Sequence, residues 1–380
     1  MDINSFVIGY AKGKASSGGG SGGGGSMEGF HKVQFFNDDR TTLLYTVFVP
    51  TGASAMYAGE TLESTVDAMF VFEGFQPAAT NVTADMDCFA VYSEQVKSLD
   101  QTSWAKISEL SADGTAQNYF SVGDTKLIHI EGTVGTVAVN VDYAVYIIGF
   151  DHNEELEGKG IHFGTFKSLE NGKDYSLRDE GHDTRYVDGT KHFNMNHWGG
   201  NNTYGGWAAC DLRYDILGST DKAPLGYGSA KTSSSVGYDA SETCAINPVA
   251  GTLMAALPSD LRAVMKPMTK YTDGKGNKST TEDGVIATID YLPLLAEFEV
   301  SGTRSRANQY EQYKQKRYAY YAAGNSVLKI GHSVNAYASW WGRSQDTGYN
   351  YSFWYVNASG GVTGCRHQDY SNCLAPIFKV

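Results

Sequence analysis

The sequence predicts an α+β fold made of short strands, long loops and few helices. Aromatic residues make up 13% of its 380 residues and charged residues only 19%, with 25 Tyr and 44 Gly. Helical bundles are instead rich in Ala, Glu, Lys and Leu. Short runs of β-branched and aromatic residues, bounded by Asp, Gly, Pro or Asn, recur from residue 33 onward. We therefore expect a strand-and-loop protein with a tyrosine-rich surface.

Charge and hydropathy argue against several functional classes. The formal net charge of −12 argues against nucleic-acid binding, which usually leaves a basic patch or stripe on the protein. No apolar run reaches the roughly 18–20 residues that span a bilayer, so membrane insertion is not expected. The first residues show no basic segment followed by an apolar one. No secretory signal is therefore expected, and the protein is expected to be made in the cytoplasm.

The cysteines predict neither a zinc site nor a disulfide framework. The five are Cys88, Cys210, Cys244, Cys365 and Cys373. Their number is odd and no C-x-x-C pair occurs, so a structural zinc site is not expected. Free thiols suit a cytosolic protein, and a bridge between Cys365 and Cys373 is the alternative. We expect no metal and no cofactor.

The N-terminal segment predicts an anchor peptide on a flexible tether. Residues 1–14 include the apolar Phe6, Val7 and Ile8 but are too few to bury a core of their own. Residues 15–29 form a Gly/Ser-rich linker whose ends lie on the order of 20 Å apart as a random coil. An engineered fusion junction is the alternative interpretation of this linker.

The segment 30–93 is expected to form a small sheet. Its strand-like runs are VQFF, LLYTVFVP, FVFEGFQP and CFAVY, each bounded by turn residues. These runs and their spacing are similar to the small β-grasp repeats of internalin-type surface proteins. Phe75 stands where that family usually has Trp. The resemblance implies a spacer or adhesion unit without catalytic activity.

Helices and further strands are expected after residue 94. The run SWAKISEL predicts a helix over about 104–111, and residues 139–166 alternate apolar and polar side chains as a half-buried strand pair does. A Gly/Asn loop leads into a helix expected at 210–217. Another helix is expected with Ser259 as its N-cap and Asp260 near its positive end.

This order of elements closely resembles a C-type-lectin-like domain. The motifs that carry the resemblance are YFSVGDTK, IIGFDHN, NTYGGWAACDLR, LPSDLRAVMKPMTK, YLPLLAEFEVSG and WWGRS, spread over residues 94–380. Such domains occur in phage and gut-bacterial proteins and are related to the formylglycine-generating-enzyme scaffold. Gly342, where Leu is usual, and the ending CLAPIFKV depart from the family pattern. The resemblance implies a C-type-lectin-like domain preceded by a small β-grasp domain and a Gly-rich tethered N-terminal anchor.

The C-terminal stretch 339–380 carries the candidate binding residues on an apolar frame. The large residues expected in the core are Trp340, Trp341, Phe353 and Trp354. Arg343 and Ser344 are expected to form a buried hydrogen-bonding corner behind them. The patches between are rich in Tyr, which gives rigid contact area, and in Ser, Gly and Asn, which give adaptable hydrogen bonding.

Several C-type-lectin-like domains are the variable proteins of diversity-generating retroelements, in which chosen codons of the C-terminal strands vary while the frame is kept. The resemblance implies that the ligand-binding positions include Gln345, Asp346, Thr347, Tyr349, Asn350, Tyr351, Ser352, Tyr355, Asn357, Arg366, His367, Gln368, Asp369, Tyr370, Ser371 and Asn372.

We therefore expect a non-enzymatic receptor-binding or adhesion protein on the surface of a phage virion. Its partners would be a bacterial cell-surface protein or glycan, and other virion proteins through residues 1–14. A homo-oligomer, with a trimer as the candidate form, would raise avidity by about 10²–10⁴ if its geometry permits. The alternative is a structural virion component, such as a head fibre or decoration protein, that makes protein contacts only.

The sequence gives weaker support to a catalytic or cofactor-binding function. The segment 226–232 has no Gly before its Lys, unlike a phosphate loop. The loop after Asp273 has Lys at its third position, which does not suit calcium. His192 and His197 have no Cys or carboxylate nearby in sequence to complete a metal site. The pattern around Cys365 and Cys373 does not match that of the related oxidases.

Overall fold

The computed structural model describes residues 8–9, 29–62, 70–94, 97–168, 171–185, 190–196, 203–220 and 243–380. The predicted anchor (1–14) is described only at β1, and the linker (15–29) only at its last residue. His197 and the segment 226–232 lie outside the described residues. The structure divides the chain into two compact units, Met1–Lys97 and Ser98–Val380, whereas the sequence placed a boundary between residues 93 and 94. The fold class is α+β, as predicted.

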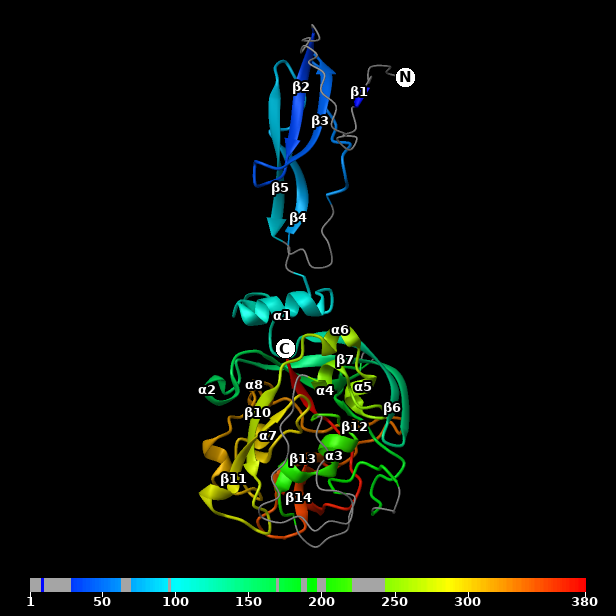
Figure 1. Cartoon of the computed structure of the whole chain (residues 1–380), viewed down its shortest axis with the longest axis vertical. Coiled ribbons are helices and arrows are strands. Elements are labelled where there is room, and N and C mark those ends of the chain that lie inside the picture. Colours follow the sequence, from blue (N-terminus) through cyan, green and yellow to red (C-terminus); the bar gives the residue numbers. More distant parts are fainter. Residues whose placement is uncertain are drawn as a thin grey trace. The chain divides into compact units, whose positions relative to one another are not determined.

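A mixed five-stranded sheet forms the first unit (Figure 1). Its strands are β1 (Ile8–Gly9), β2 (Phe30–Phe36), β3 (Leu43–Pro50), β4 (Phe70–Gln76) and β5 (Met86–Glu94). The hairpins β2–β3 and β4–β5 are antiparallel, and they join through the parallel pair β2–β5. β1 adds to the outer edge of β3, with Ile8 opposite Phe48. The four strands predicted between residues 30 and 93 are confirmed.

Aromatic rings fill one face of this sheet. Phe75 packs edge to face on Phe35, with ring centroids 4.7 Å apart, and Tyr57 lies 5.0 Å from Phe75. Phe35 is buried, as are Val33 on the same strand and Val47 on β3. Phe75 therefore acts as a core aromatic at the position where the resemblance expects Trp.

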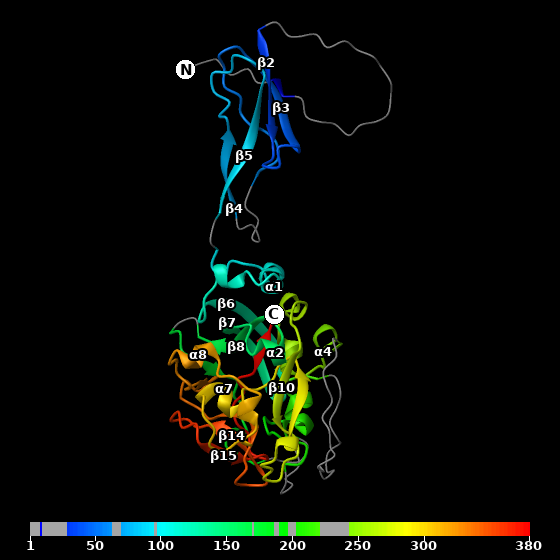
Figure 2. The same cartoon turned by 90° about the vertical axis from the view of Figure 1, so that its left-hand side faces the viewer.

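The second unit contains eight short α-helices and eleven strands within its described residues (Figure 2). Its helices are α1 (Trp104–Ala112), α2 (Glu154–Glu157), α3 (Asp211–Asp215), α4 (Thr243–Ile246), α5 (Leu253–Ala256), α6 (Ser259–Arg262), α7 (Glu297–Ser301) and α8 (Ala319–Ala322). Its strands are β6 (Thr125–Val134), β7 (Val137–Phe150), β8 (Ile161–Lys167), β9 (Tyr175–Ser176), β10 (Met268–Asp273), β11 (Val285–Asp290), β12 (Ile330–Gly331), β13 (Trp340–Gln345), β14 (Ser352–Val356), β15 (Gly364–His367) and β16 (Ile377–Lys379).

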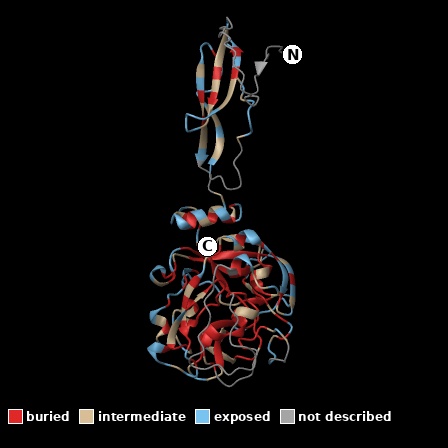
Figure 3. Cartoon of the chain, viewed as in Figure 1, coloured by how far each residue is buried: buried red, intermediate tan, exposed pale blue. Residues whose placement is uncertain are grey.

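The largest sheet of this unit has the order β16-β8-β7-β6, so the last strand returns beside a strand more than 200 residues earlier. Phe163 of β8 stacks on Phe378 of β16 at 5.0 Å, and Trp104 of α1 meets Phe163 edge-on at 5.5 Å. α1 therefore covers one face of this sheet. Figure 3 shows how much of the second unit is buried.

The helix predictions are confirmed in position but not always in detail. α1 begins as predicted, and the Ser103 side chain accepts a hydrogen bond from the Lys106 backbone N–H. The helix predicted at 210–217 is the shorter α3. Ser259 is the first residue of α6, not its N-cap, because Pro258 occupies the cap position. The prediction of Ser259 as the cap was wrong.

A three-stranded antiparallel sheet, β13-β14-β15, carries the C-terminal frame. The residues Trp340, Trp341, Phe353, Trp354, Arg343 and Ser344 are fully buried, as predicted. The indole N–H of Trp341 donates to the Phe193 carbonyl at 2.9 Å, and that of Trp340 donates to the Val327 carbonyl at 3.0 Å. Because each polar ring atom has a partner, these large side chains hold fixed positions.

Candidate ligand-binding surface

The structure divides the sixteen predicted binding residues into two groups by burial. The buried ones are Gln345, Asp346, Ser352, Gln368, Asp369, Ser371 and Asn372. Those at least partly open to solvent are Thr347, Tyr349, Asn350, Tyr351, Tyr355, Asn357, Arg366, His367 and Tyr370. A side chain without solvent access cannot touch a ligand that arrives from solution, so direct contact falls to the second group.

Hydrogen bonds to Asp179, Asn194 and Asn196 hold the turn after β15 in place. Asn196 Nδ2 donates to Gln368 Oε1 at 2.6 Å, and Asn194 Nδ2 donates to the Asp369 carbonyl. Ser371 Oγ donates to Asp179 Oδ1 at 2.7 Å. These bonds satisfy buried polar groups that would otherwise destabilise the fold. The expectation that this whole turn is displayed to a ligand is thereby corrected, because its buried members support the surface.

The buried residues at the end of β13 are held in a similar way. Gln345 Nε2 donates to the Asp273 carbonyl at 2.9 Å. Asp346 Oδ1 accepts from the Gly348 backbone N–H at 2.9 Å, which shapes the loop that leads to Tyr349. These two side chains therefore set the path of the loop.

An aromatic ledge, defined as Tyr349, Tyr351 and His367, lies where β14 begins and β15 ends. Tyr351 stacks on His367 with ring centroids 4.6 Å apart, and Tyr349 lies 5.8 Å from Tyr351. The Tyr349 side chain is 47% exposed. The ledge therefore offers tyrosine rings to solvent in a fixed arrangement.

An arginine–tyrosine stack, defined as Tyr355, Arg366, Tyr370 and Arg185, lies beside the ledge. The Arg366 guanidinium sits 4.8 Å from the centre of the Tyr370 ring and 5.9 Å from that of Tyr355. Arg185 lies 5.6 Å from the same Tyr370 ring, and Arg366 forms an ion pair with Asp183. Contacts of this kind are attractive, because the positive guanidinium group interacts favourably with the negative face of an aromatic ring.

Arg366 and His367 are neighbours in the chain but point to opposite faces of β15. His367 pairs with Ser352 and Arg366 pairs with Phe353, and successive side chains of a strand alternate between its faces. β15 is the outer strand of its sheet. The ledge and the stack can therefore meet only around the edge of β15, and together we call them the β15 edge surface.

Asp369 joins the two parts of the β15 edge surface. One carboxylate oxygen lies 2.5 Å from His367 Nδ1, and the other lies 2.7 Å from Arg185 Nη2. Burial alone would raise the pKa of Asp369, but the hydrogen bonds from His367 and Arg185 outweigh it and lower the pKa. Asp369 is therefore charged at neutral pH and positions a residue on each side.

Arg185 and Asp183 were absent from the sequence-based set. They lie on a different segment, and Arg185 is 184 residues away from Asp369, its partner. No local motif marks them. Three of the predicted residues that are open to solvent are not part of the β15 edge surface: Thr347, Asn350 and Asn357. Thr347 Oγ1 donates to the Arg306 carbonyl at 2.9 Å, and the Asn357 side chain accepts from Ser359 and Gly361 in its own turn.

The two C-terminal cysteines do not form a redox pair. Cys365 lies on the outer strand β15, where it pairs with Trp354 of β14, whereas Cys373 lies next to the opposite edge strand, where it bridges to Trp340 of β13. Three strand spacings separate them, roughly 14 Å, and both thiols are free. Burial raises the pKa of each thiol to about 12, which suppresses the reactive thiolate. The alternative of a disulfide between them was wrong.

A buried ionic network forms a further concentration of titratable groups in the second unit. His152, Glu157 and Glu299 place ligand-type atoms within 4.8 Å of one another. Lys270 Nζ lies 2.6 Å from Glu157 and 3.0 Å from Glu299, and Arg343 binds Glu299 through two nitrogens at 2.6 and 2.8 Å. The two carboxylates are thus neutralised by two cations. We read the network as structural, since a metal ion would have to displace Lys270.

We expect His152 to make the second unit less stable at acidic pH. Its ring stacks on Tyr318 at 3.6 Å, and burial, aided by the nearby Lys270, lowers its pKa from 6.5 to about 3. Below pH 6.5 the unfolded chain therefore binds a proton that the folded chain does not, and stability falls as the pH drops. Between pH 7 and pH 5, the wild type should lose roughly 1–2 kcal/mol more than His152→Phe in urea titrations. Equal losses in both proteins would contradict this assignment.

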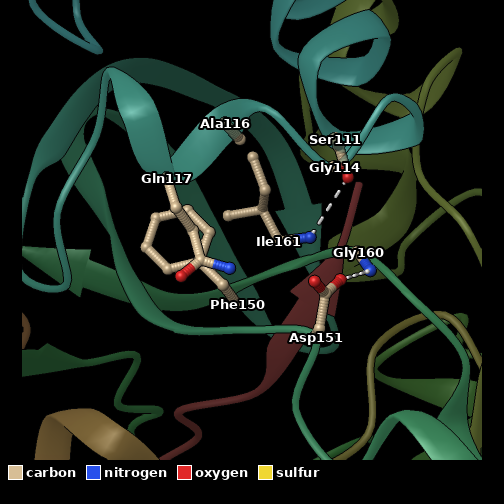
Figure 4. Close-up of a pocket in the computed structure, with 8 residues that line it drawn as sticks. All are labelled: Ser111, Gly114, Ala116, Gln117, Phe150, Asp151, Gly160 and Ile161. Atoms are coloured by element: carbon tan, nitrogen blue, oxygen red, sulfur yellow. Dashed lines mark hydrogen bonds between the residues drawn. The ribbon is translucent and has the colours of Figure 1, made fainter.

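A small pocket in the second unit lies between α1, β7 and β8 (Figure 4). Its lining includes Ser111, whose hydroxyl accepts from the Ile161 backbone N–H, and Asp151, whose carboxylate accepts from the Gly160 N–H at 2.9 Å. It has room for little more than a water molecule.

No helix among the described residues is long and apolar enough to cross a membrane.

Comparison with known proteins gives one match. Residues 192–380 match the model of a family described as "Domain of unknown function (DUF6273)". This range contains the three-stranded sheet and every residue of the β15 edge surface except Arg185. Neither the curated proteins nor the solved structures include a match to the chain. The second half of the chain is therefore similar to a family that has no assigned activity.

Proposed function

We propose that the second unit is a C-type-lectin-like domain that binds a bacterial cell-surface ligand through the β15 edge surface. The observation that carries the proposal is an unbroken run of contacts from Tyr349 through His367 and Asp369 to Arg185 and Arg366. Tyr and Arg are among the residues enriched at the positions that contribute most to binding in protein interfaces. Here they are at least partly open to solvent and rest on a buried frame.

The rest of the chain fits a displayed binding protein. The parallel pair β2–β5 between two hairpins supports a β-grasp spacer for the first unit. The resemblance noted above makes a phage virion the setting, with the N-terminal anchor contacting other virion proteins. An adhesion protein needs no catalytic group, and both C-terminal thiols are poor nucleophiles at neutral pH. The function we propose is therefore receptor binding without catalysis.

The test is attachment of the full chain, presented as a multimer on streptavidin, to a panel of gut-bacterial cells. A variant with Tyr351→Ser and His367→Ser removes most of the ledge and should lose attachment at least tenfold, because such positions each contribute about 2 kcal/mol or more. Its melting temperature should stay within a few degrees of the wild type, since both side chains are partly open to solvent.

Tyr313→Ser is the matched control, because Tyr313 is 71% exposed and belongs to neither the ledge nor the stack. It should attach as the wild type does. Attachment that survives the double substitution would remove the ledge from the site. No attachment by any of the three folded proteins would favour the alternative of a structural virion component.

A further inference from the structure

The two arginines of the stack have N–H donors that make no hydrogen bond to the described residues. A guanidinium carries five N–H donors. Among the described residues, Arg185 uses only Nε and Nη2, both toward Asp369, and Arg366 uses only Nη1, toward Asp183 and Asn372. The side chain of Arg185 is 57% exposed and that of Arg366 is 24% exposed. The unused nitrogens therefore have access to solvent.

A further donor near Arg366 lacks an acceptor. Asn372 is fully buried, and its Oδ1 lies 3.4 Å from Arg366 Nη1, while its Nδ2 has no hydrogen-bond partner among the described residues. Asn372 is closed to solvent, and Asn194 Oδ1 nearby is a buried acceptor without a partner among the described residues. The donors that a ligand can reach are therefore those of the two arginines. A group that only accepts hydrogen bonds, such as a carboxylate or sulfate, complements these donors, and a guanidinium can bind it through two parallel N–H bonds.

The size of the β15 edge surface favours a small ligand. The ledge, the stack and Asp183 comprise eight residues, whereas a stable protein–protein interface takes about 20–30 residues on each side. Tyr349, which is 47% exposed, is the only one of these eight residues that is both large and apolar and exposed. Arg185 and Asp183 are exposed as well. The remaining members are partly buried Tyr, His and Arg side chains, which combine flat groups with polar atoms.

We propose that the β15 edge surface recognises an acidic glycan, an inference that rests on the proposed binding function. Sugar rings lie against the tyrosines of the ledge, and a carboxylate or sulfate of the glycan accepts hydrogen bonds from the unused nitrogens of Arg185 and Arg366. Asp183 and Asp369 keep the two guanidinium groups in place and offset their charge, so recognition depends on hydrogen-bond geometry as well as on charge.

The test is titration of the full chain with pairs of oligosaccharides that differ only in charge. Oligogalacturonate and its methyl ester share one backbone, as do dextran sulfate and dextran. We expect an acidic member to bind at least tenfold more tightly than its neutral counterpart, with the preference shrinking as salt is raised. Arg185→Gln should reduce the preference about tenfold, and Arg185→Lys should restore it only in part, because an ammonium lacks the planar fork.

Lys159→Gln is the control, because it also removes one positive charge from a side chain that is 62% exposed and belongs to neither the ledge nor the stack. It should leave the preference unchanged. Equal binding of acidic and neutral sugars, binding of neither, or an effect of Lys159→Gln equal to that of Arg185→Gln would each overturn the inference. Cell attachment that is lost on Tyr351→Ser and His367→Ser but kept on Arg185→Gln would overturn it too, while leaving the proposed function standing. In that case a protein receptor becomes the ligand to test.

Discussion

Arg343→Met should lower the free energy of unfolding of the second unit by about 3–5 kcal/mol, the range found when one partner of a buried ion pair is removed. Arg343 and Glu299 are both fully buried, and Arg343 also donates to the Leu294 carbonyl at 2.6 Å. Burial alone would raise the pKa of Glu299, but Arg343 and Lys270 outweigh it and hold the pKa well below its usual range. Without Arg343, only Lys270 remains to neutralise both Glu299 and Glu157.

Tryptophan fluorescence during urea unfolding measures this change selectively. All six tryptophans of the chain lie after residue 98, so the signal reports the second unit alone. Lys275→Met is the matched control, because it breaks an ion pair with Asp283 in which both side chains are largely exposed. Such surface pairs contribute at most about 1 kcal/mol. If Arg343→Met costs no more than Lys275→Met, the network does not hold the frame in place.

Gly342→Ala should destabilise the second unit by about 3 kcal/mol or more, because there is no room for a side chain at this position. A Cβ added to Gly342 would lie 2.0 Å from Cε3 of Trp354 and 2.8 Å from the Leu295 carbonyl oxygen. Overpacking of a filled core costs about 1–3 kcal/mol and sometimes more, and here a ring and a backbone carbonyl would both have to move.

A double-mutant cycle tests the cause. In a Trp354→Leu background the ring atoms that meet the new Cβ are gone, so the penalty of Gly342→Ala should shrink by roughly 1 kcal/mol or more. Gly149→Ala is the control, since its new Cβ would lie 3.4 Å from its nearest neighbour, the Tyr318 ring. An unchanged penalty in the Trp354→Leu background would show that the Trp354 ring is not the obstacle.

The sequence predicts the frame of the C-terminal sheet well, because large apolar side chains are strongly favoured in the core of a protein. Trp340, Trp341, Phe353 and Trp354 are buried as expected, and the strands of the first unit follow from β-branched and aromatic runs between turn residues. These signals are local, so they can be recognised in the sequence without knowledge of the tertiary structure.

The candidate site is only partly predictable because its polar residues depend on distant partners. Composition placed Gln368, Asp369 and Ser371 on the surface, as Asp, Ser and Gln usually are. Asn196, Asn194 and Asp179 satisfy them in the interior instead. The same long-range pairing brings Arg185 to Tyr370. Neither the burial of these polar residues nor the contact of Arg185 with Tyr370 can be recognised in the local sequence, because each requires two segments about 180 residues apart to meet.

The arrangement of the β15 edge surface depends on the length of the loop between β14 and β15 as well as on the residues that the two strands carry. Residues 357–363 connect the two strands, and they fix the register in which Arg366 faces one side and His367 the other. Removing one residue from this loop would shift β15 by one position and send every side chain of the strand to the opposite face. His367 would then leave Tyr351, and Arg366 would leave Tyr370. The candidate surface therefore depends on the number of residues in this loop as well as on the side chains of the two strands.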